Sequence, residues 1–386
     1  MSIPPPSGCC TTNELPALRP IHSAVRVVIL ADTFFASRER ELLARLEIGL
    51  ADEGIRVIQA SPSDRGAATT DASSVFRTSV TFPARGLPFT TGLRARRLAE
   101  RLTEIEVGGE DGDIDIVHVF GGTLWPFAQF VAEACGADLV LEVWRAGLVE
   151  RAAAFPATET RTLTLAPDPA IDRALKAAGV SGRLASWGVH AGDPPKPKIQ
   201  EGQAPTVILV GAGNDARGMR TALTGLAECA RRHPEVLVFV DALAARRADL
   251  YPLAASLGIT ANVSFIEEME TRRDLLVHAD LLLLCEALGE QRTVVLDAMA
   301  HGMVVLSAED RFSDCLRDGT TARLLKSPGA RDWGTAVNAA FSDVTGSRRL
   351  GETAREFVMQ ERRASDHVRA VLEAYSWLRR EPAAVP

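Results

Sequence analysis

The sequence predicts an α/β protein of two tandem, doubly wound, Rossmann-like domains that face each other across a cleft. Short apolar runs alternate with helical patterns along the chain, which is typical of parallel sheets covered by helices. A polar, Pro-rich stretch at 191–205 divides this alternation into two series and has the composition of a linker. The 386 residues, 46% of them hydrophobic, suffice for two such cores.

The first series starts with the apolar run VRVVILA at 25–31, which predicts a buried strand. A helical pattern with leucines four residues apart follows and ends at Gly54, and the strand IRVIQAS at 55–61 completes a β-α-β unit. Later strands are expected at 113–120, 137–144, 163–167 and 183–190, with helices at 127–135 and through Leu175.

The second series repeats this alternation and ends in a helix at 366–380 whose apolar residues form one stripe. Strands are expected at 206–211, 235–241, 262–266, 281–285, 303–307 and 322–325, and helices at 217–232, through Leu257, near His278 and over Thr293–Ala300. The predicted organisation is a disordered tail at 1–22, a first domain at 23–190, the linker at 191–205, a second domain at 206–365 and a C-terminal helix at 366–386.

The composition of the chain argues against some classes of partner and site. The net charge of −7 argues against a nucleic-acid partner. Six scattered Cys, without C-x-x-C or Cys/His ligand spacing, predict reduced thiols and no metal site. With no apolar run near the ~18 residues of a membrane span and no signal core, we expect a cytoplasmic protein. The cluster Arg94, Arg96, Arg97 and Arg101 is either a solvated helix face or a peripheral contact with the inner membrane face.

The loop VGAGNDARG leads from a predicted strand into a helix. Backbone N–H groups at Gly211, Gly213 and Gly218, with Arg217 beside them, would suit a diphosphate. The alternative is a plain strand-to-helix turn with a solvated Arg217. A Rossmann fingerprint is not met, because Gly218 comes two positions too late after Gly213.

The stretch GEQRTVVLDAMAHG at 289–302 combines a glycine hinge with two acids. Glu290 lies at the start of the predicted helix, where a carboxylate also simply compensates the helix dipole. Asp297 lies in mid-helix among apolar residues, where Asp is a poor helix former. We therefore expect its carboxylate to bond either ligand hydroxyls or neighbouring backbone. His118, inside a predicted strand, is either a core histidine or a cleft residue.

Several local patterns occur in the order typical of one family: DIDIVHVFG, SWGVHAGDPP, VGAGNDARG, GEQRTVVLDAMAHG and LRDGTTARLL. Over roughly residues 24–380 the chain resembles the retaining GT-B glycosyltransferases of the family 4 type. The resemblance implies that the second domain binds a nucleotide-diphosphate sugar, that the first binds the acceptor, and that the last helix crosses back to the first domain.

The resemblance also implies roles for single residues. The second Glu of the family's E-x7-E motif, which holds the ribose, falls on Asp297, and the first, on the donor sugar, falls on Gly289, one step from Glu290. The diphosphate-binding Arg and Lys fall on Ala212 and Arg217. The remaining family positions place an acid on Asp314, a histidine on Trp144 and a Gly-Gly loop on FFASRER.

We therefore expect an enzyme that transfers a sugar from a nucleotide-diphosphate sugar, used as co-substrate without a cofactor, to a carbohydrate, lipid-linked or small-molecule acceptor. The expected catalytic residues are Glu290 and His118. Gly211, Gly213, Arg217, Gly218, Gly289, Asp297 and Asp314 are expected to bind the donor. The alternative is a non-catalytic GT-B homologue that acts as a binding or scaffold protein. A nicotinamide-dependent oxidoreductase is a third reading, but it lacks the glycine fingerprint.

Overall fold

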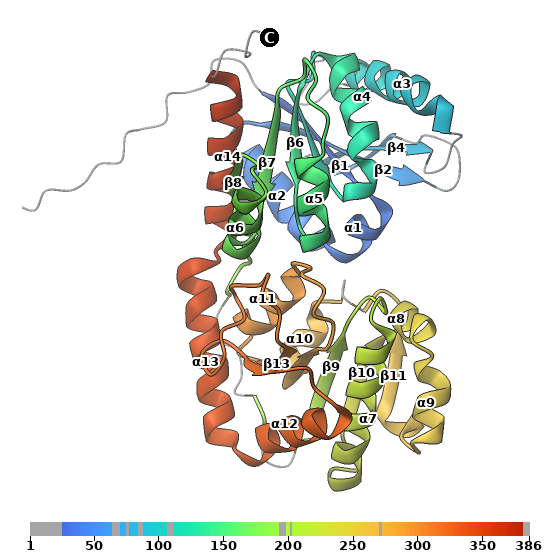
Figure 1. Cartoon of the computed structure of the whole chain (residues 1–386), viewed down its shortest axis with the longest axis vertical. Helices are drawn as coiled ribbons and strands as arrows, with labels where there is room; N and C mark the ends of the chain where they lie inside the picture. The colour runs from blue at the N-terminus through green and yellow to red at the C-terminus, as the bar shows by residue number, and fades with distance from the viewer. Residues whose placement is uncertain are drawn as a thin grey trace, which may run out of the picture.

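The structure, a computed structural model, describes residues 25–63, 70–74, 77–83, 88–105, 112–192, 198–200, 203–269 and 272–380. The tail predicted at 1–22 lies outside these residues, as does part of the predicted linker. Strands in the described part of the chain form two separate sheets, each covered by helices (Figure 1). The predicted α/β fold class is confirmed.

The first sheet contains eight described strands in the order β3-β4-β2-β1-β5-β6-β7-β8. Only β3 runs antiparallel, against β4, and the other neighbours are parallel. Its strands are β1 (Arg26–Ala31), β2 (Arg56–Ser63), β3 (Thr70–Ser74), β4 (Arg77–Pro83), β5 (Ile116–Phe120), β6 (Asp138–Glu142), β7 (Thr162–Ala166) and β8 (Gly182–Leu184).

The second sheet is parallel throughout its six described strands, in the order β11-β10-β9-β12-β13-β14. Its central strands are buried along their whole length, as the continuous apolar runs predict. Its strands are β9 (Thr206–Val210), β10 (Leu237–Asp241), β11 (Val263–Ile266), β12 (Leu281–Leu284), β13 (Val304–Ala308) and β14 (Arg323–Leu325).

Helices connect successive strands and cover both sheets. Those of the first half are α1 (Thr33–Arg38), α2 (Arg40–Asp52), α3 (Thr91–Glu104), α4 (Trp125–Cys135), α5 (Val149–Ala153) and α6 (Pro169–Ala177). Those of the second half are α7 (Ala216–Arg232), α8 (Ala242–Arg247), α9 (Leu250–Ser256), α10 (Asp274–His278), α11 (Thr293–Ala300), α12 (Ala330–Ser342), α13 (Val344–Glu361) and α14 (Ala364–Arg380).

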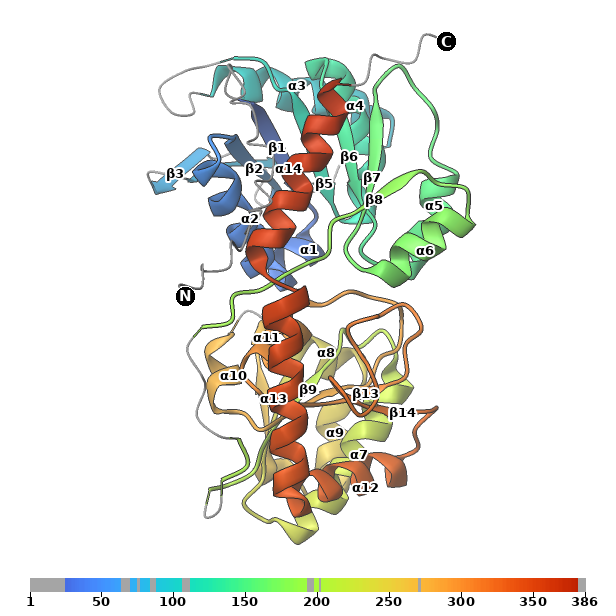
Figure 2. The ribbon, with the colours of Figure 1, turned by 90° about the vertical axis from the view of Figure 1, so that its left-hand side faces the viewer.

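The last helix returns to the first sheet. Figure 2 shows α13 lying along the second half and α14 continuing onto the first half, beside α2. α14 buries the stripe that the sequence predicts, with Val368, Val371, Tyr375 and Leu378 facing inward and Leu372 only partly buried. The apolar face of α14 therefore belongs to the core of the first half.

Four elements differ from the sequence-based expectation. β3 and β4 were not expected, because among the described side chains of β4 only Val80 and Phe82 are buried apolar residues. The loop expected after β1 is helix α1, which Asp32 caps by accepting the Phe35 N–H at 2.6 Å. β8 is shorter than the predicted strand at 183–190, because the residues after it leave the sheet.

The chain crosses between the two halves at two places that lie side by side. Val189, after β8, donates its N–H to Arg362 O at 2.9 Å and accepts the Ala364 N–H at 3.1 Å. Gly188 permits this approach, because a Cβ on it would lie 2.1 Å from Arg363 O. The two crossing segments are thus joined by backbone hydrogen bonds.

We expect Gly188→Ala to destabilise the protein by about 1–3 kcal/mol, because the added methyl group must push the two crossing segments apart. Urea unfolding followed by circular dichroism measures the loss. Gly147→Ala is the matched control, since a Cβ at Gly147 meets nothing within 4 Å. Equal stability of both variants would contradict the close packing at Gly188.

Candidate functional site

The loops at the carboxyl ends of the two sheets lie directly against each other. Ala146 donates its N–H to Gly289 O at 2.9 Å, and Gln291 donates its N–H to Trp144 O at 2.9 Å. The pair Arg145 and Glu290 thereby forms an antiparallel bridge between a loop that follows β6 and one that follows β12. Ligands of doubly wound sheets bind at these carboxyl ends, so this interface is the place to look for a site.

Gly289 lies in the left-handed region at φ 67°. A Cβ there would lie 2.5 Å from Ala146 Cβ and 3.0 Å from the Phe312 ring. No side chain fits at this position, including the carboxylate that the family motif has there. Glycine is therefore required by the contact between the two halves.

Glu290 is buried beside two arginines. Its carboxylate lies 3.7 Å from Arg145 Nη1 and 3.7 Å from Arg292 Nη1. Burial raises the pKa of the Glu290 carboxyl, and the negative charge of Glu286 raises it further. This predicted catalytic residue does lie between the two halves, with its carboxylate directed at the two arginines.

The N-terminus of α11 receives a carboxylate from the first half. Glu39, between α1 and α2, accepts the Thr293 N–H at 3.2 and 3.3 Å and also accepts the Thr293 hydroxyl. Arg292 Nε lies 3.7 Å from the same carboxylate. Burial, and then the nearby Arg38, lower the pKa of the Arg292 guanidinium to about 9.

A second carboxylate, that of Glu286 after β12, accepts hydrogen bonds from the loop between β9 and α7. Glu286 accepts the N–H groups of Ala212 at 2.5 Å and Asp215 at 2.8 Å. Asp215 in turn caps α7 by accepting the Gly218 N–H at 2.9 Å. Three N–H groups of this loop, those of Ala212, Asp215 and Gly218, are thus bonded to side chains of the chain itself.

The glycines and the cation of that loop lie in different surroundings. Gly211 is buried, and its carbonyl accepts from Arg38 at 3.3 Å. Gly213 is at φ 75°, and a Cβ there would lie 2.9 Å from Ala244 O. Arg217 is exposed and lines, with Gly218, a separate pocket of ≈ 360 Å³ next to α12.

Among the described residues, the carboxylate of Asp297 faces two arginines rather than backbone groups. One carboxylate oxygen lies 3.1 Å from Arg45 Nη1 on α2, and the other lies 3.5 Å from Arg273 Nε. Arg273 also donates to the Thr293 hydroxyl at 3.1 Å. Two partly buried arginines, one from each half, therefore compensate the charge of Asp297.

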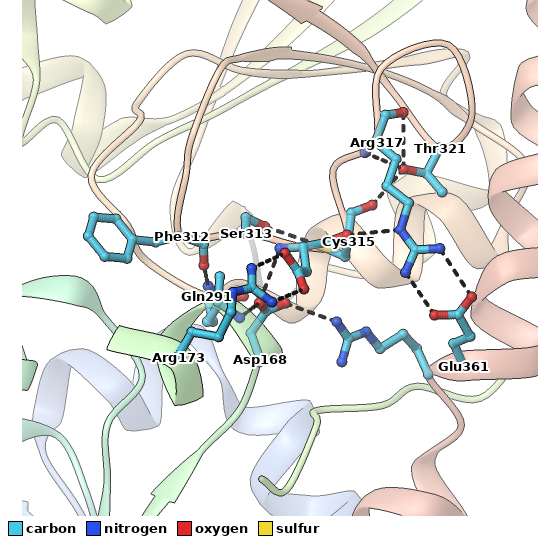
Figure 3. A network of polar contacts seen from close by, with 12 residues as sticks. Asp168, Arg173, Gln291, Phe312, Ser313, Cys315, Arg317, Thr321 and Glu361 are labelled. Atoms are coloured by element: carbon cyan, nitrogen blue, oxygen red, sulfur yellow. Dashed lines mark hydrogen bonds and ion pairs between the residues drawn. The ribbon is translucent and has the colours of Figure 1, made fainter. Parts of the chain in front are cut away.

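Asp314 also joins the two halves, through bonds with Arg173 and Asp168 of the first half, which Figure 3 labels. Arg173 on α6 donates to both of its carboxylate oxygens, at 3.0 and 2.7 Å, and this lowers the pKa of Asp314. The Asp314 N–H donates to Asp168 at 3.1 Å, and Asp168 accepts from Arg362 at 2.9 Å. Arg317, in the same loop, forms a separate two-bond ion pair with Glu361.

His118 lies in the core of the first half, fully buried, and not between the halves. Its Nδ1 lies 2.8 Å from the Tyr375 hydroxyl on α14, and its Nε2 lies 3.2 Å from Glu142. Trp187 donates to the other Glu142 oxygen at 2.7 Å. Burial lowers the pKa of His118 to about 3 and raises that of Glu142 to about 8. Of the two alternatives, the core histidine is therefore the one observed, bonded to side chains.

A small cavity lies between the halves beside Glu290 and Arg292. The cavity lined by Asp168, Trp187, Glu290, Arg292 and Asp310 measures ≈ 20 Å³, which holds about one water molecule. Within the described ranges no group of three His, Cys, Asp or Glu could hold a metal ion. No helix of the described part is long and apolar enough to cross a membrane.

Solved structures of similar architecture cover almost the whole chain. A sucrose-phosphate synthase from Thermosynechococcus elongatus matches with a TM-score of 0.71 and 14% identity, over 92% of this chain and 99% of that one. Anabaena HepE in complex with UDP-glucose matches with a TM-score of 0.69 and 14% identity, over 91% and 99%. A glycosyltransferase from Rickettsia africae matches with a TM-score of 0.67 and 11% identity, over 93% and 100%.

The chain has the GT-B fold. Among curated proteins, the lipopolysaccharide core biosynthesis glycosyltransferase LpsE of Rhizobium meliloti is 25% identical over 154 residues. The match spans 40% of this chain and 44% of LpsE, less than half of either protein. No protein-family model matches the chain.

On this GT-B frame the structure brings Gly211, Gly289, Glu290 and Asp297 to the interface, Asp314 to its rim, and places Arg217 outside it. The sequence analysis did not single out Glu39, Glu286, Arg38 or Arg292. One signal was available for Glu286, an acid two residues beyond the apolar run of β12. Nothing local could pair Glu39 with a helix 254 residues further along the chain.

We expect Glu142→Gln to change how stability depends on pH. Because the folded-state pKa of Glu142 is raised to about 8, its contribution is complete below the unfolded value of 4.5 and is lost as pH rises to about 8. The variant should therefore lose less stability than the wild type between pH 6.5 and 8; protonation of His118 in the unfolded state is common to both proteins and cancels in the comparison. Urea unfolding at these two pH values checks this, with Glu361→Gln as an exposed control. Equal pH slopes would contradict it.

Proposed function

We propose that this chain is a glycosyltransferase that moves a sugar from a nucleotide-diphosphate sugar to an acceptor hydroxyl. The observation that carries the proposal is the GT-B frame, with the carboxyl ends of two parallel sheets facing each other and α14 crossing back. Proteins of similar architecture include one bound to UDP-glucose and a lipopolysaccharide glycosyltransferase, WaaG. The partial likeness to LpsE points the same way.

The donor would lie across the second half. Its diphosphate would meet the loop from Gly211 to Gly218 and the N-terminus of α11, and its ribose would meet Asp297. Arg38 and Arg292 lie at the interface beside these groups, and Arg217 lines the separate pocket next to Gly218. Fixed cations and helix N-termini stabilise a leaving diphosphate, so no cofactor is proposed. Transfer with retention follows from the resemblance to the family 4 type.

Donor binding requires the two halves to separate from the arrangement described, since ≈ 20 Å³ does not admit a nucleotide. Separation also frees Asp297 from Arg45, because Arg45 belongs to the first half. The acceptor, a carbohydrate, a lipid-linked sugar or a small molecule, would then bind on the first half. We propose a cytoplasmic location, with peripheral contact at the inner membrane face if the acceptor is lipid-linked.

A thermal-shift panel of UDP, GDP and ADP sugars, followed by an assay of nucleotide-diphosphate release, tests this function. A donor that binds selectively raises the melting temperature, and release that depends on an added acceptor identifies transfer. Binding without release in any combination would refute the enzymatic proposal.

Asp297→Ala and Arg217→Ala should each weaken binding of the nucleotide by about tenfold to a hundredfold, the loss of one charged hydrogen bond. Isothermal titration calorimetry with the nucleotide found in the panel measures this. Glu361→Ala and Arg317→Ala are the controls, because each removes a charge of the same sign from an exposed ion pair outside the interface. Unchanged affinity in both test variants would refute the site assignment.

A second function is favoured by particular residues: a non-catalytic GT-B protein that binds or organises partners. Gly289 has no carboxylate and no room for one, Ala212 offers no cation, and Glu286 brings a negative charge to the diphosphate loop. A purified protein whose melting temperature responds to no nucleotide in the panel would support this function over transfer.

A further inference from the structure

The first turn of α11 is capped from the opposite half of the molecule. Its N-cap residue is Arg292, whose guanidinium has no acceptor with which to cap a helix. The Thr293 N–H is instead satisfied by Glu39, which lies 254 residues earlier in the chain. The positive end of the helix dipole thus meets a carboxylate that the other half supplies.

The carboxylate of Glu39 is surrounded by the kinds of donor that would bind a free anion. A backbone N–H, a hydroxyl and the guanidinium of Arg292 surround its carboxylate, which is 2% exposed as a residue. Arg38, the preceding residue, contributes a second positive charge to the same region. These donors are of the kinds that bind phosphate oxygens at helix N-termini.

The neighbouring loop repeats the arrangement. Glu286 takes the N–H groups of Ala212 and Asp215, so the second set of backbone donors is also filled by a carboxylate. The two sets differ in one respect: Glu286 belongs to the same half as its donors, whereas Glu39 does not. Of these two carboxylates, Glu39 is therefore the one whose contact must break when the halves separate.

We infer that Glu39 competes with the anionic group of the ligand for the donors of Thr293 and Arg292. Ligand binding at α11 and separation of the two halves are therefore coupled. The inference rests on the proposed function, because it takes the competing group to be the diphosphate of the donor. A diphosphate that bonds Thr293 and Arg292 displaces Glu39 and removes a contact that keeps the halves together. The closed arrangement is thus self-inhibited.

Pyrophosphate is the probe, because it carries the diphosphate group without sugar or base. Calorimetric titration compares the wild type, Glu39→Gln and the control Glu361→Gln, which removes an equal charge from an exposed ion pair. We expect Glu39→Gln to bind pyrophosphate about tenfold to a hundredfold more tightly than the wild type and the control to be unchanged. Equal affinity of Glu39→Gln and wild type overturns the inference.

A second variant and a second measurement guard against misfolding, since Glu39 is buried. Glu39→Asp keeps the charge but shortens the side chain by one methylene, so it should also bind pyrophosphate more tightly than the wild type. In the wild type, small-angle scattering should show a larger radius of gyration at saturating pyrophosphate. An unchanged radius overturns the coupling between binding and separation.

The two proposals fail separately. Tighter pyrophosphate binding by Glu39→Gln in a protein that transfers no sugar upholds the competitor role and refutes the transferase. Sugar transfer by the wild type, with no gain of pyrophosphate affinity in either Glu39 variant, upholds the transferase and overturns the competitor role.

Discussion

The pairing of buried charges between the two halves is the constraint on which this structure depends. A charged side chain removed from water is costly unless an opposite charge accompanies it. Arg292 is compensated by Glu39, and Asp297 by Arg45, so each pair has one member in each half. Separation of the halves would therefore remove these partners from Glu39 and Arg45, while Asp297 would keep Arg273 and Arg292 would keep Glu290.

The sequence predicted the fold better than the site. The continuous apolar runs located the central strands, and the predicted helix Thr293–Ala300 is observed with those bounds, because local patterning determines such elements. The site depends on partners far apart in the chain: Asp297 and Arg45 are separated by 252 residues. Family resemblance assigned Asp297 to the ribose of a donor but could not reveal that Arg45 and Arg273 lie beside it.

The departures from the family pattern have a common physical basis. Gly289, where the family has a carboxylate, is what allows the loop at 144–146 to approach and pair with the loop at 289–291. The charged side chains around Gly289 then form ion pairs with one another. The absence of a side chain at Gly289 therefore improves the fit of the two halves to each other.

The adjacent crossings at Val189 and Arg363 have a mechanical consequence. Two connections that run side by side act as one narrow joint, which yields to bending more readily than to sliding. Any relative motion of the halves must then widen the far side of the interface more than the side near the joint. A ligand would enter from the rim opposite the crossings, and the segments at the joint would keep their hydrogen bonds throughout the movement.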